Sequence, residues 1–129
     1  MTLPTSVCLD SNVILAVRFG ESKAEALARL LDRLPHLVVC GPLVAERMPR
    51  DPRAEEWLRD SGIDVDWTLG RSVWRRVGEL HAGYTARRRV ITASLIGAHA
   101  EVSGLPLLTL NPADYSSFTE LDVLTVKQE

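Results

Sequence analysis

Cysteine is scarce in this chain, with two among 129 residues, and neither belongs to a metal-binding or redox motif. Cys8 and Cys40 lie in the apolar runs SVCLD and LVVCG, with no CxxC spacing and no group of histidines nearby. We therefore expect buried, reduced thiols rather than a disulfide or a zinc ligand. A cytoplasmic location follows from that expectation.

Long apolar runs are also missing. No stretch approaches the roughly 18 apolar residues that cross a bilayer, and the first ten residues lack the basic region of a signal peptide. We expect no membrane function. With 46% apolar and 25% charged residues, the composition is typical of a soluble globular protein, and the length predicts one domain, 1–129, with one active surface.

An excess of positive charge is lacking as well, because the net charge is −2. This balance argues against generic, charge-driven binding to nucleic acid. The arginines are unevenly placed, however, and six of them lie between positions 71 and 89 beside one acid, Glu79. They are Arg71, Arg75, Arg76, Arg87, Arg88 and Arg89. The sequence therefore allows a local anion-binding face, in which guanidinium groups bind phosphate in bidentate fashion, although a solvated surface explains the run 87–89 equally simply.

Short apolar runs alternate with helical patterns and predict five strands. These strands lie within segments 6–17, 36–42, 62–67, 105–110 and 121–126. In the first segment, SVCLDSNVILAV, we expect a buried strand followed by a polar turn at Asp10-Ser11-Asn12. Continuous apolar strands separated by helices indicate an α/β fold, with a parallel central sheet of about five strands and helices on both faces.

The predicted helices cover about 22–34, 42–46, 53–60, 69–82 and 90–103. Ser22 and Glu25 have the spacing of a capping box at the start of the first helix, and Pro35 ends it. Pro42 begins the second helix, and Gly104 closes the last. The connections are too short for a linker between domains.

Acidic residues recur where the predicted strands end. Asp10 follows the first strand, Glu46 lies one helical turn past the second, and Asp114 follows the fourth. Ligands bind beyond the carboxyl ends of parallel strands, and a carboxylate among apolar residues needs a cation or donors to compensate its lost solvation. Oxygen ligands favour Mg²⁺ or Mn²⁺, and such a metal typically serves hydrolysis of a phosphodiester.

Each acid alone has a simpler explanation. Asp10 is a common turn or helix-capping residue, Glu46 suits the first turn of a helix, and Asp114 suits a turn. Their joint placement is what favours a functional site. His99, in the apolar segment LIGAHAEV, is expected to be packed and hydrogen-bonded. The tryptophans Trp57, Trp67 and Trp74 have the spacing of core or partner-contact residues.

Four motifs resemble the PIN domain family, and specifically the VapC-type toxin ribonucleases of bacterial type II toxin–antitoxin pairs. They are CLDSNVIL, GPLVAER with Glu46, RRRVITASLIGAHAEVSGLPLLTLNPADY, and within it LLTLNPADY with Thr109, Asn111 and Asp114. The resemblance covers nearly the whole chain. It implies a metal-dependent endoribonuclease in which Asp10, Glu46 and Asp114 ligate Mg²⁺ or Mn²⁺.

One position departs from the family pattern. Ala93 stands where the family carries its third catalytic Asp, and a methyl group cannot ligate a metal. Neighbouring Thr92 and Ser94 have only neutral oxygens, and each is turned by about 100° around a helix. Activity is therefore expected to be weak or absent. A naturally degenerate member and a deliberately inactivated enzyme both remain open.

The resemblance also implies roles for the surrounding residues and for partners. The side chains that would orient the acids are Ser11, Asn12, Thr109 and Asn111. Arg87, Arg88 and Arg89 would hold RNA phosphates. The implied partners are an antitoxin and a second copy of the chain. Two alternatives remain: a degenerate domain that binds RNA or a partner without catalysis, and a receiver-like α/β domain, which the third motif fits poorly.

Overall fold

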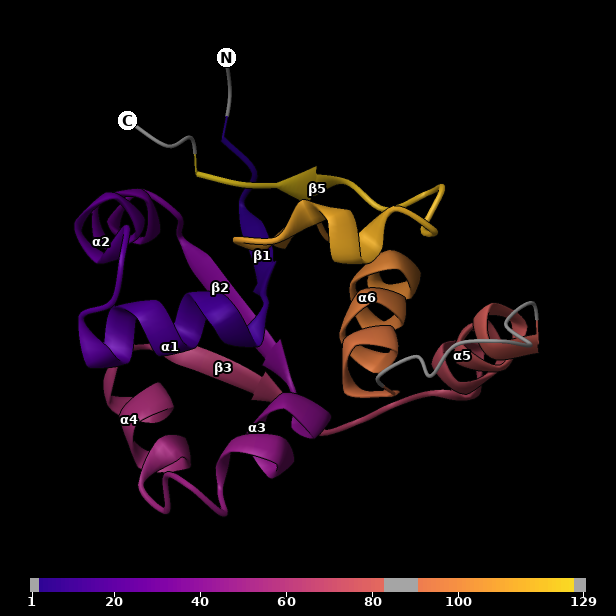
Figure 1. Ribbon diagram of the computed structural model, residues 1–129, viewed down its shortest axis with the longest axis horizontal. Coiled ribbons are helices and arrows are strands. Elements are labelled where there is room, and N and C mark those ends of the chain that lie inside the picture. The colour runs from indigo at the N-terminus through magenta and orange to yellow at the C-terminus, as the bar shows by residue number, and fades with distance from the viewer. Residues whose placement is uncertain (1–2, 83–90, 127–129) are drawn as a thin grey trace.

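The computed structural model describes residues 3–82 and 91–126, and within them five strands alternate with six helices (Figure 1). The strands are β1 (Ser6–Leu9), β2 (His36–Cys40), β3 (Ile63–Asp66), β4 (Leu107–Leu108) and β5 (Val123–Leu124). The helices are α1 (Ser11–Phe19), α2 (Ala24–Asp32), α3 (Gly41–Arg47), α4 (Ala54–Asp60), α5 (Arg71–Ala82) and α6 (Ile91–Ser103), with a 3-10 turn, η1 (Pro112–Tyr115). None of the described helices is long and apolar enough to cross a membrane.

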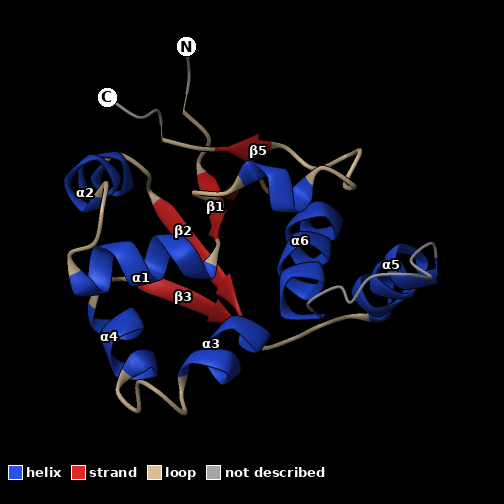
Figure 2. Ribbon diagram, viewed as in Figure 1, coloured by secondary structure: helices blue, strands red, loops and turns tan. Residues whose placement is uncertain are grey.

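The strands form one sheet in the order β3-β2-β1-β4-β5, and every neighbouring pair is parallel. This confirms the predicted α/β architecture. Because crossovers between parallel strands are right-handed, α1 to α4 cover one face and α5 and α6 the other. Figure 2 shows α1, α2 and α4 grouped together and α5 and α6 set apart from them. Both faces are covered, so Val7 and Val39 are fully buried.

The predicted polar turn after β1 is wrong, because α1 begins there directly. Asp10 is the N-cap of α1, and its side chain accepts a hydrogen bond from the Ser11 backbone N–H. Val13, Ile14 and Ala16 then bury one stripe of the helix. The residues that favour a turn are also those that favour an N-cap, so the helix starts where a turn was predicted.

The predicted capping box at Ser22 and Glu25 is also wrong. The helix α2 begins at Ala24, after Lys23, whose φ of 69° lies in the left-handed region and whose side chain makes no capping hydrogen bond. The preceding helix ends at Gly20, also left-handed at φ 66°. A tight connection between two helices therefore replaces a capped start. At the other end of the chain, Gly104 closes α6 at φ 70°, as predicted.

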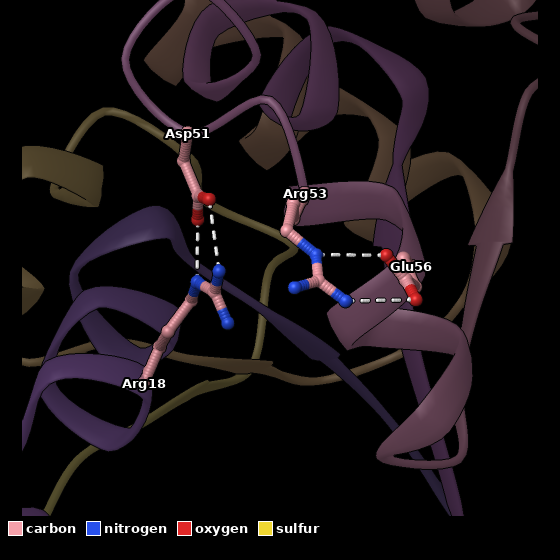
Figure 3. A network of polar contacts seen from close by, with 4 residues as sticks. All are labelled: Arg18, Asp51, Arg53 and Glu56. Carbon is pink, nitrogen blue, oxygen red and sulfur yellow. Dashed lines mark hydrogen bonds and ion pairs between the residues drawn. The ribbon is translucent and has the colours of Figure 1, made fainter.

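An ion pair joins α1 to the connection between α3 and α4. Figure 3 shows Arg18 reaching Asp51, and its Nη2 donates to Asp51 Oδ1 at 2.9 Å. The two side chains are 19% and 9% exposed, whereas the separate pair Arg53–Glu56 is far more exposed. The guanidinium of Arg18 also lies 5.4 Å from the ring centroid of Trp57. These contacts tie α1 to the segment that follows α3, the helix that carries Glu46.

Asp51→Asn is expected to lower the melting temperature at pH 7 by several degrees, because it removes one partner of a largely buried pair. The hydrogen bond from Arg18 holds the pKa of the Asp51 carboxyl below its usual value. Its stabilising contribution is therefore present above the unfolded pKa of about 4 and is lost as the pH falls through the lower folded value. Thermal unfolding between pH 7 and pH 3 should show the difference between the two proteins shrinking. The matched control, Glu56→Gln in the exposed pair, should change little, and a pH-independent difference for Asp51→Asn would contradict this account.

Candidate functional site

The carboxyl ends of β1 and β4 bring two polar residues together. Leu9 pairs with Leu108 in the parallel register, so Asp10 and Thr109 are the next residues on adjacent strands. The Asp10 backbone N–H donates to the Leu108 carbonyl at 3.0 Å. The site therefore begins where the sheet hydrogen bonding ends, at the edge where ligands bind in parallel sheets.

Asp10 holds a buried carboxylate, and the residue is only 5% exposed. Its Oδ1 accepts from the Ser11 N–H at 2.7 Å, and its Oδ2 accepts from the Thr109 hydroxyl at 2.7 Å. In the described part of the chain no arginine, lysine or histidine forms an ion pair with it. A carboxylate in this setting is oriented by neutral donors and is left with unused acceptor capacity.

Thr109 and Asn12 connect the start of α1 to the end of β4. The Thr109 hydroxyl donates to Asp10 and accepts from Asn12 Nδ2 at 3.2 Å and from the Asn111 backbone N–H at 3.0 Å. Asn12 Oδ1 in turn accepts from the Leu110 N–H at 3.1 Å. The structure therefore places Ser11, Asn12 and Thr109 around Asp10, while Asn111 contributes through its backbone and leaves its side chain exposed.

Thr109→Val is expected to destabilise the protein by about 1–3 kcal/mol, because a buried donor and acceptor disappear while the volume is kept. Thr109 is fully buried, so water cannot replace its hydroxyl at the same place. Thr109→Ser keeps the hydroxyl and should recover much of the loss, apart from the missing methyl group. Chemical denaturation of both variants measures the difference. Equal destabilisation by valine and serine would show that the hydroxyl network is unimportant.

Glu46 and Asp114 lie at the rim rather than beside Asp10 in the buried network. Both residues are exposed, Glu46 on α3 and Asp114 on η1. Across residues 3–82 and 91–126, no three His, Cys, Asp or Glu side chains are gathered closely enough to hold a metal ion. The three predicted ligands are thus not a preformed cluster in this chain, and their metal-binding role stays a prediction.

Tyr115 packs beneath the acidic site and is 2% exposed. Burial, followed by the negative charge of Asp10 and a hydrogen bond to it, raises the pKa of the Tyr115 hydroxyl well above its usual value. The charge of Asp114 acts in the same direction. The turn η1 is seated closely on α6, since a Cβ on Gly97 would lie 2.5 Å from Phe118 Cζ and 3.0 Å from Tyr115 Cδ1. The absence of a side chain at Gly97 thereby allows Tyr115 and Phe118 to pack closely on α6.

Asp66 is a site residue that the sequence analysis missed. It ends β3 opposite Cys40, and its Oδ1 accepts from the Thr68 N–H at 3.0 Å. Its Oδ2 lies 2.9 Å from His99 Nε2, and this bond keeps the pKa of the Asp66 carboxyl below its usual value. His99 is 3% exposed, which confirms the predicted packed and hydrogen-bonded histidine. The Asp66 carboxylate is thus already hydrogen-bonded to a buried side chain, that of His99.

Both cysteines are buried and free, as predicted. Burial raises the pKa of the Cys8 thiol to about 12 and that of Cys40 to about 11. With His99 Nε2 donating to Asp66, its Nδ1 can accept from the Cys8 thiol at 3.8 Å. Protonated thiols in the core are neither nucleophiles nor metal ligands at neutral pH.

Ala93 is the third residue of α6 and is partly exposed. The helix packs against α5, β2 and α3, the last of which carries Glu46. The next residue, Ser94, is buried, and its hydroxyl oxygen lies 3.1 Å from His81 Nε2. The Ser94 hydroxyl is therefore already hydrogen-bonded to another side chain of the protein. The predicted RNA-binding residues Arg87, Arg88 and Arg89 lie outside the described residues.

A family model described as PIN domain matches residues 7–120. Solved structures share the fold: VapBC-1 from nontypeable Haemophilus influenzae has a TM-score of 0.73 at 18% identity, covering 93% of this chain and 97% of that one. VapBC2 from Rickettsia felis, bound to a promoter DNA fragment, has a TM-score of 0.69 at 15% identity, with 95% and 99% coverage. A toxin–antitoxin complex from Klebsiella pneumoniae has a TM-score of 0.67 at 19% identity, with 92% and 96% coverage. No curated protein matches the chain in sequence.

Proposed function

The chain belongs to the PIN domain family, and from this premise we propose that it is a VapC-type toxin ribonuclease whose metal site is left incomplete by Ala93. Its substrate is RNA and its reaction is hydrolysis of a phosphodiester bond. Family membership also removes the receiver-like alternative. The solved structures that share the fold include toxin–antitoxin complexes, which supports the toxin assignment.

The observation that carries this proposal is the state of Asp10. A buried carboxylate that neutral donors orient, without a cationic side chain in the described ranges, is expensive to keep unless something else binds it. Its position, at the carboxyl edge between α1 and β4, is where a ligand of a parallel sheet binds. A divalent cation fits an oxygen-only donor set of this kind.

The remaining acids fit such a cation only in part. Glu46 and Asp114 are exposed, and the described residues contain no cluster ready to hold a metal. In its described part, the Ala93 chain therefore lacks a complete set of metal ligands. With an acid at position 93, Asp10, Glu46 and Asp114 are the proposed ligands of Mg²⁺ or Mn²⁺, which would polarise the phosphate and activate water.

The partners follow from the same proposal. We propose that an antitoxin covers the acidic edge, by which we mean the carboxyl edge of the sheet with Asp10, Glu46 and Asp114. We also propose that the chain forms a homodimer. A cytoplasmic location is proposed because it suits two reduced cysteines. Arg87, Arg88 and Arg89 stay the proposed phosphate contacts beside the acids. The toxin–antitoxin complexes that share the fold favour the antitoxin in particular.

A second candidate function is a catalytically degenerate domain that binds RNA or a partner protein. The lack of a metal-holding cluster within residues 3–82 and 91–126 favours it. This candidate predicts binding that is insensitive to EDTA, and no cleavage under any metal.

RNA cleavage by the chain with Ala93→Asp, assayed beside the unsubstituted chain with Mn²⁺, tests the proposal. A gain of EDTA-sensitive cleavage supports the ribonuclease. If RNA is bound but never cleaved, the ribonuclease proposal fails and the binding domain takes its place.

A further inference from the structure

Two of the three tryptophans are on the surface of the protein. Trp67 is 57% exposed and Trp74 is 51% exposed. Of the two roles predicted for the tryptophans, core packing is therefore wrong for these two and partner contact stays a prediction, while Trp57 packs against the core cluster. A single exposed apolar residue needs no explanation, but two large indoles within eight residues of chain are unusual for a surface without a partner.

Trp67 contacts the start of α3 at the carboxyl end of β3. It follows Asp66 directly, so it stands where β3 ends. Its Cε3 lies 3.1 Å from the position that a Cβ on Gly41 would take, so the indole rests on the first residue of α3. Since more than half of the residue stays exposed, one side of the ring is anchored and the remainder is free. An anchored aromatic ring with a free face suits base stacking.

Trp74 occupies the outer face of α5 together with two arginines. Trp74 and Arg75 stand three and four residues after Arg71, which places all three on one side of the helix. All three are exposed, while the opposite side of α5, including Val73 and Val77, is buried. The outer face is therefore both aromatic and basic.

Glycines flank Trp74 on both sides along the chain. Gly70 and Gly78 stand four residues before and after it, and a Cβ on either would meet nothing within 4 Å. Neither position therefore contributes a side chain to the surface around Trp74, which is itself 51% exposed.

The two arginines of this face are available for an anion. Neither Arg71 nor Arg75 forms an ion pair within residues 3–82 and 91–126. Arg76, one position further on, bonds Glu101 and lies 3.6 Å from Glu79. Arg71 and Arg75 are thus exposed cations beside an exposed indole, and guanidinium groups suit phosphate as a partner.

We propose that Trp67, Arg71, Trp74 and Arg75 form a binding surface for single-stranded RNA, here called the tryptophan–arginine strip. The tryptophans stack on bases and the arginines contact phosphates. This inference rests on the proposed function, because RNA is the substrate proposed there and Trp67 directly follows the last residue of β3, at the carboxyl edge of the sheet. Single-stranded RNA is the occupant we favour, because the two exposed arginines complement its phosphates and an exposed indole can stack on any of its bases.

Fluorescence anisotropy of a short, labelled oligouridine, measured with the full Ala93 chain in EDTA, tests the strip without cleavage. Trp74→Ala is expected to weaken binding about ten-fold, and Trp67→Ala by a similar factor. Trp74→Phe should restore most of the affinity, because it keeps a stacking ring. Arg71→Ala combined with Arg75→Ala should lower the slope of log affinity against log salt by about 1.4, since each phosphate contact on a single strand accounts for about 0.7.

The matched controls lie elsewhere on the surface. Phe19→Ala removes an exposed aromatic ring from α1, and Arg29→Ala with Arg33→Ala removes two exposed arginines at and beyond the end of α2. These variants should bind the oligouridine like the unsubstituted chain, apart from a small general effect of charge. Thermal unfolding of every variant checks that its fold is kept.

The outcomes separate the strip from the proposed catalytic activity. Unchanged RNA affinity and salt slope in the strip variants would overturn the strip, and a changed oligomeric state alone would assign these residues to a protein interface instead. If Ala93→Asp brings cleavage and the strip variants still bind normally, the strip fails and the ribonuclease stands. If Ala93→Asp brings no cleavage but the strip variants lose RNA, the ribonuclease fails and the strip stands.

Discussion

Cleavage of single-stranded RNA in the presence of Mn²⁺ is expected to rise about 100-fold or more when Ala93 is replaced by Asp. The substitution adds a carboxylate to the first turn of α6, which packs against the helix that carries Glu46. One further anionic ligand raises both the occupancy of a divalent cation and the charge that holds its bound water. Gains in binding and in rate therefore act together.

The neighbouring residue provides the control for this experiment. Thr92→Asp adds the same charge to the same turn of α6, but about 100° away around the helix axis. The Thr92→Asp chain should show no comparable rise in RNA cleavage, because the carboxylate at position 92 points in another direction. Ala93→Asn, which has the shape of Asp but no charge, should also stay weak. Equal activity in the Ala93→Asp and Thr92→Asp chains would mean that added charge, rather than a ligand at position 93, explains the gain.

Asp10→Asn, introduced together with Ala93→Asp, is expected to reduce cleavage about 100-fold or more, back to the level of the unsubstituted chain. Asn is as good an N-cap as Asp, and its one carbonyl oxygen can still accept from the Ser11 N–H while its amide group faces the Thr109 hydroxyl, so α1 should keep its start. The melting temperature should therefore change far less than the activity. This separation distinguishes a ligand from a residue that merely supports the fold.

Activity and thermal unfolding are measured on the same preparations, with and without Mn²⁺. Mn²⁺ should raise the melting temperature of the Ala93→Asp chain and leave the double variant unchanged, because a ligand stabilises only the state that binds it. Asp60→Asn, in an exposed position of α4, is the matched control and should keep full activity. Full RNA cleavage by the chain with both Asp10→Asn and Ala93→Asp would show that Asp10 is not a metal ligand.

Most of the sheet could be predicted from the sequence because its strands are continuous apolar runs, which few other structures produce. The helix α1 could not, because Asp10, Ser11 and Asn12 suit a turn and an N-cap equally. What decided between them was burial of Val13 and Ile14 against the rest of the protein, a tertiary effect. The short strands β4 and β5 were placed correctly, but the pairing that limits them to two residues each depends on their neighbours.

The candidate site was only partly visible in the sequence. The proximity of Asp10 and Thr109 follows from two parallel strands that end together, and the structure shows the resulting hydrogen bond. The exposure of Glu46 was not predictable, because the direction of a side chain on a short helix depends on how that helix packs. Asp66 was missed because IDVDW alternates like a strand with a polar face, and nothing local indicates that His99 would reach it.

Calorimetric titration of Mn²⁺ into the Ala93→Asp chain, with and without Asp10→Asn, tests most directly whether the acids at the sheet edge hold a cation. The account predicts a saturable site in the Ala93→Asp chain that is lost when Asp10 becomes Asn and is weak or missing in the unsubstituted chain. Binding of Mn²⁺ that persists unchanged in the Asp10→Asn double variant, or no binding to the Ala93→Asp chain at all, would contradict it.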